Sequence, residues 1–304
     1  MIGARAHAEL AAGIRAHRPE LEIRGAPHVS LTADDLQWGD CYLGFKRPPT
    51  GTWGGIRWIH CTGAGVDAFI YGEPLPDSIL LTRTSEPFGP AISEFAVSRA
   101  LAFTQDFRAV ERNQRTREWK SVDTRMLSGS RVLVVGTGEV GTAIANRFTA
   151  MGCHVRGVSR SGGSRPGFER VFETTALAEV VPDADFLVLA TPLTPETRGL
   201  VSRSVLACCR GAVLINVGRG AVVDESAIPE ALDAGWLRGA ALDVFDVEPL
   251  PVSSPLWDRA DVMVSPHGSG PTTLPAAIES FLETLGTLER GERPIGLVDR
   301  ERGY

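Results

Sequence analysis

The sequence of 304 residues lacks the features that mark several classes of protein. It has no apolar run near 20 residues, so no membrane-spanning helix is predicted. Its first ten residues, MIGARAHAEL, lack the apolar core of a signal peptide, which predicts a cytoplasmic protein. Basic residues are outnumbered, with 31 against 37 acidic ones, and the net charge of −6 argues against nucleic acid as the main partner.

Cysteine is scarce as well. The five cysteines are odd in number and form no C-x-x-C motif, so reduced thiols are predicted instead of a disulfide framework or a zinc site. No metal site is predicted. What the sequence does contain, 43% hydrophobic and 22% charged residues, is ordinary for a folded soluble protein. The length favours two domains.

Glycine, by contrast, is abundant, at 33 of 304 positions. A residue without a side chain is needed where the backbone turns with positive φ or approaches another group closely. Two glycine clusters, in residues 63–65 and 136–141, follow predicted strands. They are therefore the first places to look for a binding site.

The order of the apolar segments predicts two domains in which helix and strand alternate. A helix is expected over residues 6–18, preceded by a strand that is short or missing, and a single long helix over 91–115 connects the domains. A last helix over 274–290 returns to the first domain. Strands are predicted over residues 41–45, 56–61, 79–82, 131–135, 155–158, 186–190, 212–217, 240–244 and 262–264. This alternation favours doubly wound parallel sheets.

The second glycine cluster has the G-x-G-x-x-G spacing at Gly136, Gly138 and Gly141. It follows an apolar strand and opens a helix, which is the context of a dinucleotide-binding fingerprint. The first glycine permits the tight turn, the second lets backbone approach the pyrophosphate, and the third lets helix and strand pack closely. The alternative is a glycine turn in an unrelated α/β fold.

The end of the next predicted strand distinguishes the two nicotinamide cofactors. NAD-selecting folds place an acidic residue about 20 residues after the first glycine, where it binds the ribose 2′-hydroxyl. Here Ser159, Arg160 and Ser161 stand at that place, and no carboxylate follows until Glu169. Hydroxyls and a guanidinium suit a 2′-phosphate, so NADP(H) is predicted over NAD(H). A solvated basic loop is the alternative.

Three polar residues lie just after later predicted strands: Arg219 in NVGRG, Glu248 in DVFDVEP and His267 in SPHG. Hydride addition to a carbonyl develops negative charge on oxygen. His267 could supply the proton as general acid, Glu248 could hold the imidazolium, and Arg219 could polarise the carbonyl or pair with a carboxylate. Spacing alone leaves open that these are three unrelated surface groups.

The first glycine cluster lies in the segment HCTGAGVD, residues 60–67. Backbone N–H groups at Ala64 and Gly65 could form a nest that binds a carboxylate. An ordinary turn with Asp67 as a helix cap is equally compatible with the spacing.

Taken in order, these motifs resemble the D-2-hydroxyacid dehydrogenase family. The resemblance rests on GTGEVG at 136–141, TPLTPETRG at 191–199, NVGRG at 216–220, DVF through EPL at 243–250, and SPH at 265–267. The Ser-Arg-Ser loop and the ending VDRERGY are similar to the NADPH-dependent glyoxylate/hydroxypyruvate reductase branch. The implied fold is α/β with a Rossmann cofactor domain, residues 93–274, inserted into a flavodoxin-like substrate-binding domain, residues 1–92 and 275–304.

The resemblance also implies an activity and partners. It implies NADPH-dependent reduction of a small 2-ketoacid such as glyoxylate or hydroxypyruvate to the D-2-hydroxy acid. The family is usually a dimer built through the cofactor domains, which is compatible with the charged arm over residues 108–120. Alternatives are an NAD(P)-sensing, corepressor-like binding protein of the same fold, or a sibling dehydrogenase acting on D-lactate, phosphoglycerate or formate.

Roles for individual residues follow from the same resemblance. Arg219, Glu248 and His267 would form the catalytic triad, and Ala64 and Gly65 the carboxylate-binding loop. Substrate contacts would also come from Phe45 and Arg83, and Asp243 would meet the nicotinamide carboxamide. The expected cofactor-binding residues are Gly136, Gly138, Glu139, Val140, Gly141, Ser159, Arg160, Ser161, Thr191, Pro192, Thr197, Val217, Asp243 and Gly268.

Overall fold

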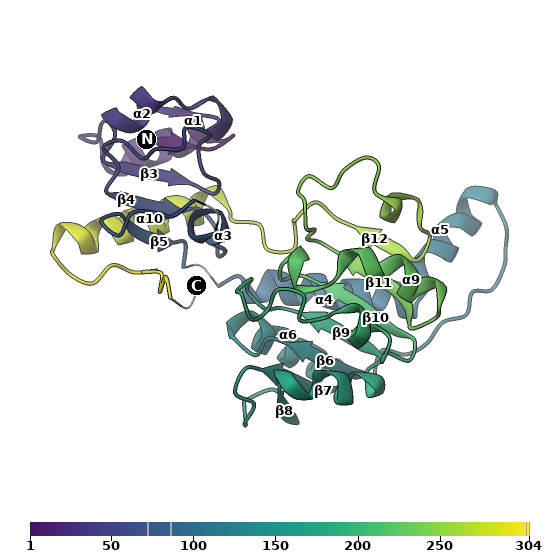
Figure 1. Ribbon diagram of the computed structural model, residues 1–304. Helices are drawn as coiled ribbons and strands as arrows, with labels where there is room; N and C mark the ends of the chain where they lie inside the picture. Colours follow the sequence, from purple (N-terminus) through teal and green to yellow (C-terminus); the bar gives the residue numbers. More distant parts are fainter. Residues whose placement is uncertain (72, 86, 302, 304) are drawn as a thin grey trace. The chain divides into compact units, whose positions relative to one another are not determined.

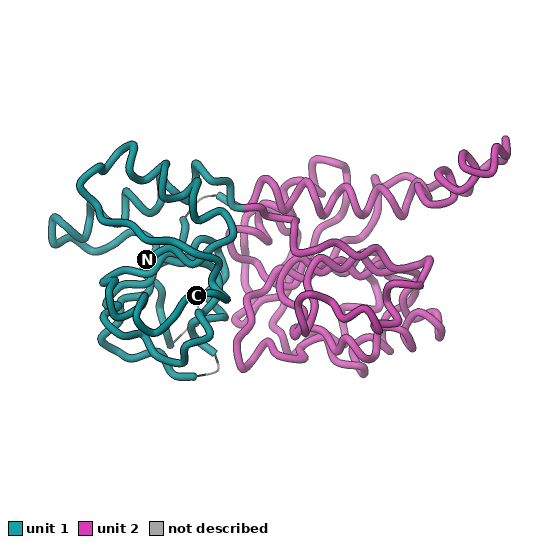
Figure 2. The backbone as a smooth tube through the Cα atoms, turned by 90° about the horizontal axis from the view of Figure 1, so that it is seen from above, with its two compact units in different colours: residues 1–87, 272–304 teal, residues 88–271 magenta. Residues whose placement is uncertain are grey.

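The computed structural model describes residues 1–71, 73–85, 87–301 and 303 (Figure 1). The chain divides into two compact units (Figure 2). Unit 1 comprises residues 1–87 and 272–304, and unit 2 comprises residues 88–271. Each unit is an α/β layer structure around its own parallel sheet, so the expected fold class is confirmed.

Unit 1 contains a five-stranded parallel sheet in the order β2-β1-β3-β4-β5, the flavodoxin-like order. Its strands are β1 (Ile2–Gly3), β2 (Gly25–Ala26), β3 (Cys41–Gly44), β4 (Trp58–Cys61) and β5 (Leu80–Arg83). Its helices are α1 (His7–His17), the 3-10 turn η1 (His28–Ser30), α2 (Ala33–Trp38), α3 (Asp67–Ile70) and α10 (Leu274–Glu289).

Both faces of the unit 1 sheet are covered, because successive side chains of a strand point to opposite sides. Along β3, Leu43 packs in the cluster with α1 and α10, whereas Tyr42 packs in the cluster on the other face with Phe69 of α3. The segment that begins at residue 272 therefore returns to complete the core of the N-terminal part of the chain (Figure 1).

Unit 2 contains a seven-stranded parallel sheet in the order β12-β11-β10-β9-β6-β7-β8. Its strands are β6 (Arg131–Val135), β7 (His154–Ser159), β8 (Arg170–Glu173), β9 (Phe186–Leu189), β10 (Ala212–Asn216), β11 (Leu237–Leu242) and β12 (Val262–Val264). Numbered from β6, this is the Rossmann order 3-2-1-4-5-6 with one added edge strand. The strand order reverses between β6 and β9, where such folds bind their ligands.

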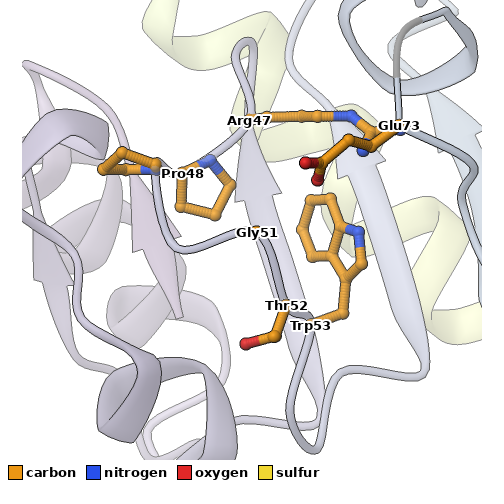
Figure 3. Close-up of a pocket in the computed structure, with 7 residues that line it drawn as sticks. Arg47, Pro48, Gly51, Thr52, Trp53 and Glu73 are labelled. Atoms are coloured by element: carbon orange, nitrogen blue, oxygen red, sulfur yellow. The ribbon is translucent and has the colours of Figure 1, made fainter.

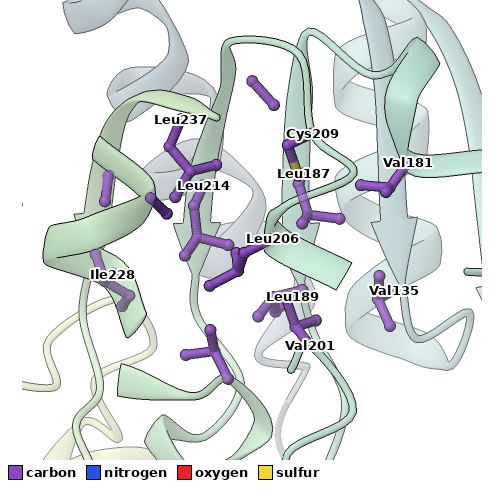
Figure 4. Close-up of a cluster of buried hydrophobic side chains, with 14 of the residues drawn as sticks. Val135, Val181, Leu187, Leu189, Val201, Leu206, Cys209, Leu214, Ile228 and Leu237 are labelled. Atoms are coloured by element: carbon purple, nitrogen blue, oxygen red, sulfur yellow. The ribbon is translucent and has the colours of Figure 1, made fainter. Parts of the chain in front are cut away.

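The helices of unit 2 are α4 (Gly89–Thr104), α5 (Phe107–Thr116), α6 (Glu139–Ala150), α7 (Leu177–Val180), α8 (Arg203–Leu206) and α9 (Ile228–Asp233). Its 3-10 turns are η2 (Thr174–Ala176), η3 (Val181–Asp183), η4 (Gly220–Val222), η5 (Glu225–Ala227) and η6 (Pro255–Asp258). Figure 4 shows the core between the sheet and α8 and α9, where Leu187, Leu214 and Leu206 meet. Cys209 belongs to this core, and burial raises the pKa of its thiol to about 12. The five cysteines, all within the described residues, form no disulfide.

Two expectations about the elements need correction, and the first strand proves to be short instead of missing. The long helix expected over residues 91–115 is two helices, α4 and α5, because Asp106 adopts a left-handed conformation (φ 42°) and its side chain accepts the N–H of Ala109 to cap α5. Strand β1 is present with two residues, and it pairs with both β2 and β3. Strands β2 and β8 were not predicted, because they are edge strands without an apolar run.

Among the described residues, no helix is both long and apolar enough to cross a bilayer. A pocket of unit 1 is lined by Arg47, Trp53 and Glu73 together with Pro48, Pro49, Gly51 and Thr52 (Figure 3). The Arg47 guanidinium lies over the Trp53 ring and donates to the carbonyls of Ala68 and Phe69 at the end of α3 (2.7 and 2.6 Å). This arginine therefore connects α3 to the segment that follows β3 through hydrogen bonds. None of the predicted site residues lines the pocket.

Candidate active site

The glycine loop joins β6 to α6 at the reversal of the strand order. Gly136 has a φ of 102°, and a Cβ added there would lie 2.7 Å from the carbonyl oxygen of Ala190. A Cβ on Gly141 would lie 1.8 Å from the oxygen of Gly136, so only glycine lets the helix approach the strand. Gly138 precedes α6 and has nothing within 4 Å of an added Cβ. Its side of the loop is open for a ligand.

Two hydroxyls beside the ends of the strands that flank β6 are buried without a hydrogen-bond partner among the described residues. They are Ser159 Oγ, at the end of β7, and Thr191 Oγ1, two residues beyond β9. Buried hydroxyls are normally hydrogen-bonded, and each orphan calls for an explanation. Together with the open side of Gly138, they match what a dinucleotide needs at this edge: backbone space for the pyrophosphate and hydroxyls for the ribose side. The residues present therefore fit the cofactor.

The loop after β9 is stabilised by hydrogen bonds between its own residues. Thr197 Oγ1 donates to the carbonyl of Pro192 (2.7 Å) and accepts the N–H of Thr194 (2.7 Å). The pKa of Glu196 lies below its ordinary value, chiefly because of a hydrogen bond with Thr194 and in part because of the positive charge of Arg160. Arg160 therefore stands near this loop, and the ends of β7 and β9 contribute to one area.

His267 and Glu248 form a hydrogen-bonded pair. The Nδ1 atom of His267 lies 2.9 Å from Oε2 of Glu248, and their side chains are 34% and 31% exposed. Burial by itself would raise the pKa of Glu248, but the hydrogen bond and charge of His267, the N–H of Phe245 and the charge of Arg219 outweigh it and hold the pKa below its ordinary value. Glu248 is therefore an ionised partner that can stabilise an imidazolium.

Arg219 is held in the loop that follows β10. The side chain of Asn216, the last residue of that strand, donates to the carbonyl of Arg219 (3.0 Å) and accepts the N–H of Gly218 (3.1 Å). The Arg219 guanidinium donates to the carbonyl of Gly218 (2.7 Å), and its charge acts on Glu248. The three predicted triad residues thus follow the adjacent strands β10, β11 and β12, and the charges of His267 and Arg219 both act on Glu248.

Asp243 is fully buried directly after β11, and its carboxylate organises the loop that bears His267. It accepts hydrogen bonds from Ser265 Oγ (2.7 Å) and from the N–H groups of Gly268 (2.9 Å) and Ser269 (2.8 Å). The N–H of His267 donates to the Asp243 carbonyl (2.8 Å), and His267 has a left-handed φ of 52°. Such a conformation is costly for a side-chain-bearing residue, so these contacts must hold it.

The other predicted cofactor residues of unit 2 surround this edge. Glu139 and Val140 begin α6, Val217 follows β10, Gly268 follows His267, and Ser161 follows the exposed Arg160. The structure places all of them at the carboxyl ends of the parallel strands or in the loops that follow. No group of His, Cys, Asp and Glu suited to a metal ion occurs within the described ranges.

The four predicted substrate residues of unit 1 also lie together. Phe45 follows β3, Ala64 and Gly65 follow β4, and Arg83 ends β5. Arg83 Nη1 donates to the carbonyl of Ala64 (3.4 Å), and a Cβ on Gly63 would lie 2.6 Å from the Phe45 ring. Helix α3 begins at Asp67 itself and its N-cap is Val66, so the alternative of Asp67 as the cap is wrong.

The loops of Arg219 and His267 are held by Asn216, Ser265 and Ser269, which are not among the predicted site residues. One signal was available for Asn216: it is a polar residue at the end of the apolar strand AVLIN, every residue of which is buried. The two serines had no local signal, because their partner lies more than 20 residues away in the chain.

Comparison with known proteins identifies the family. The model of the D-isomer specific 2-hydroxyacid dehydrogenase, NAD binding domain, matches residues 97–269. The chain is 31% identical to glyoxylate/hydroxypyruvate reductase A of Serratia proteamaculans, over 97% of this chain and 96% of that protein. The chain belongs to the D-isomer specific 2-hydroxyacid dehydrogenase family. It is accordingly an NAD(P)-dependent oxidoreductase.

Solved structures agree with this assignment over the whole chain. A D-isomer specific 2-hydroxyacid dehydrogenase from Xanthobacter autotrophicus Py2, in complex with NADPH and MES, is 35% identical with a TM-score of 0.85, covering 100% of this chain and 98% of that one. An NADPH-dependent glyoxylate/hydroxypyruvate reductase from Sinorhizobium meliloti, in complex with NADP and sulfate, is 28% identical with a TM-score of 0.85 and the same coverage.

The glycine loop yields a pair of contrasting substitutions. Gly141→Ala will destabilise unit 2 by about 3 kcal/mol, because the new methyl group overlaps the Gly136 carbonyl and forces α6 from the sheet. Gly138→Ala will leave the thermal unfolding temperature unchanged, because the added atom meets nothing and φ is −74°. It will weaken NADPH binding about tenfold or more by occupying the space for the pyrophosphate. Differential scanning fluorimetry and fluorescence titration with NADPH measure both effects, and weakened binding without loss of stability in Gly141→Ala would contradict the assignment.

Proposed function

We propose that this enzyme reduces a small 2-ketoacid, of the size of glyoxylate or hydroxypyruvate, to the D-2-hydroxy acid with NADPH as the reductant. The observation that carries the proposal is the 2.9 Å pair of His267 and the ionised Glu248, with Arg219 in the adjacent loop. The substrate class comes from the relatives of Serratia proteamaculans and Sinorhizobium meliloti, which are glyoxylate/hydroxypyruvate reductases.

The residues of unit 2 perform the acid–base part of this reaction. When bound, NADPH supplies a hydride to the carbonyl carbon, and negative charge develops on the carbonyl oxygen. Because Nδ1 of His267 is engaged by Glu248, we assign Nε2 as the atom that donates the proton to that oxygen. Arg219 polarises the carbonyl, and Glu248 stabilises His267 while it is protonated. In unit 1, Ala64, Gly65 and Arg83 are proposed to bind the substrate carboxylate, with Phe45 beside it.

The cofactor would be held by the edge of the unit 2 sheet. The glycine loop would take the pyrophosphate, and Ser159, Arg160 and Ser161 the ribose 2′-phosphate, which favours NADP(H) over NAD(H). Asp243 is proposed to meet the nicotinamide carboxamide through the remaining acceptor capacity of its Oδ2 atom, which accepts one hydrogen bond from Ser269. Relatives solved with NADPH or NADP support this choice.

A substrate panel tests the function. NADPH oxidation is followed with glyoxylate, hydroxypyruvate, pyruvate and 3-phosphohydroxypyruvate, and formate oxidation is followed with NADP. We expect the highest kcat/KM for glyoxylate or hydroxypyruvate, because the similar proteins of Serratia proteamaculans and Sinorhizobium meliloti are glyoxylate/hydroxypyruvate reductases. A preference for pyruvate, the phosphorylated ketoacid or formate would assign the chain to a sibling activity instead, and inactivity with all of them would favour a cofactor-binding protein.

We also propose a homodimer built through unit 2. Helix α5 and the segment after it expose large apolar side chains: Phe107 is 53%, Trp119 106% and Met126 79% exposed. Figure 1 shows α5 and this segment extending beyond the layers of their unit. Apolar groups of this size gathered on one segment mark an interface, and a second copy of the chain is the partner that the family resemblance implies. Sedimentation velocity at micromolar concentration should give twice the monomer mass, and a monomer would refute the proposal.

A further inference from the structure

The loop that carries Glu248 is held by a residue outside the predicted triad. The N–H of Asp246 donates to Oε2 of Glu225 (3.0 Å), 21 residues earlier in the chain. The peptide unit that contains this N–H also packs against Gly220. A Cβ added to Gly220 would lie 2.0 Å from the carbonyl carbon of Phe245 and 2.4 Å from the nitrogen of Asp246, so only glycine fits there. The peptide between Phe245 and Asp246 is thus contacted from one side and bonded at its N–H.

Phe245 connects this peptide to the catalytic pair, because its own N–H, which lies in the preceding peptide unit, is bonded to Glu248. Phe245 donates its own N–H to Oε1 of Glu248 (3.1 Å), while Oε2 of Glu248 faces Nδ1 of His267 (2.9 Å). Phe245 is 7% exposed and belongs to the unit 2 core, so the residue cannot turn freely. A displacement of the Phe245–Asp246 peptide would therefore move the carboxylate away from the imidazole.

Glu225 itself stands on a fixed segment. The preceding residues Val222 and Val223 are buried. The N–H of Val201 donates to the carbonyl of Val222 (2.9 Å), and the N–H of Asp224 donates to the carbonyl of Val201 (3.0 Å). Arg219 begins the same segment, six residues before Glu225. The carboxylate of Glu225 therefore joins the part of the chain that bears Arg219 to the part that bears Glu248.

We propose that Glu225 is a positioning residue, which holds the Phe245–Asp246 peptide so that Glu248 faces His267. This inference rests on the proposed function, in which His267 donates the proton. Glu225 acts through its hydrogen-bond acceptor. Burial and the neighbouring charges of Asp246 and Glu248 raise the pKa of Glu225, because they disfavour a third carboxylate at this place. The hydrogen bond from the Asp246 N–H acts in the opposite direction.

Two substitutions separate the hydrogen bond from the charge. Glu225→Ala removes both, whereas Glu225→Gln removes the charge and keeps an oxygen acceptor for the Asp246 N–H. The matched control is Glu230→Ala, which deletes an exposed carboxylate of α9 whose partner is Arg203. We expect Glu225→Ala to lower kcat for 2-ketoacid reduction about tenfold, a fraction of what a general acid contributes in total, with the KM for NADPH unchanged. Glu225→Gln and Glu230→Ala should stay within about twofold of the unmodified enzyme.

A spectroscopic readout makes the test independent of the reaction. The Nδ1 proton of His267 in its bond to Glu248 should give a downfield proton NMR resonance in the unliganded protein, assigned by its loss in His267→Ala. We expect this resonance to persist in Glu225→Gln and to broaden or move in Glu225→Ala.

An unchanged resonance in Glu225→Ala would overturn the proposal whatever happens to kcat, and so would equal impairment of the Ala and Gln variants. If the unmodified protein reduces no 2-ketoacid, the proposed function fails, while the resonance still decides whether Glu225 positions Glu248.

Discussion

Replacing His267 by alanine will lower kcat for ketoacid reduction by about 10²- to 10⁴-fold, the range that a positioned general acid contributes. The imidazole is the proposed proton donor beside the ionised Glu248, and alanine leaves the developing oxyanion without that donor. Cofactor binding should remain within about twofold, because the glycine loop and the Ser159 and Thr191 hydroxyls are untouched.

The chain provides its own control for this experiment. His154 forms a similar pair, with Nδ1 2.8 Å from Oε1 of Glu169, but it lies at the amino end of β7, away from the strand ends that carry the candidate site. His154→Ala should keep full turnover. Steady-state kinetics and NADPH titration of the two variants measure these effects. Full turnover in His267→Ala would show that His267 is not the general acid.

Replacing Arg160 by alanine will raise the KM for NADPH about 10- to 100-fold and leave the KM for NADH unchanged. A hydrogen bond to a charged group contributes about 1.5–3 kcal/mol, and only NADPH has the 2′-phosphate that this guanidinium would bind. Ser159 and Ser161 on either side should sustain the residual affinity. The ratio of kcat/KM for the two cofactors should therefore fall by the same factor.

Arg170→Ala serves as the control, because Arg170 is an exposed arginine of the neighbouring strand β8 whose guanidinium lies 4.5 Å from the centre of the Phe172 ring. Its removal should not change the cofactor ratio. An Arg160→Ala variant that loses NADPH and NADH equally would show that Arg160 supports the loop without contacting the phosphate, and an unmodified enzyme that prefers NADH would contradict the NADP assignment altogether.

The apolar strands and the glycine loop were predictable because their signals are local. The strands over residues 131–135 and 262–264 have the predicted bounds, because each contains an uninterrupted apolar run. Gly136 and Gly141 could be recognised from their spacing between an apolar strand and a helix, because the tight turn and the close helix each exclude a Cβ. Edge strands β2 and β8 and the break at Asp106 carry no comparable pattern, and they depend on pairing and on one side-chain cap.

The fold class, the glycine-rich edge for the nucleotide and the residue types suited to carbonyl reduction could all be derived from local patterns in the chain. The folded chain was needed to show that His267 and Glu248 meet at 2.9 Å and that Asn216, Asp243 and Glu225 hold the loops of the proposed triad. The reason is physical: Asp243 and Glu225 reach residues more than 20 positions away, and a hydrogen bond between distant segments leaves no period or spacing in the chain. Parallel strands bring such segments together at one edge, and the abundant glycine allows them to pack there without intervening side chains.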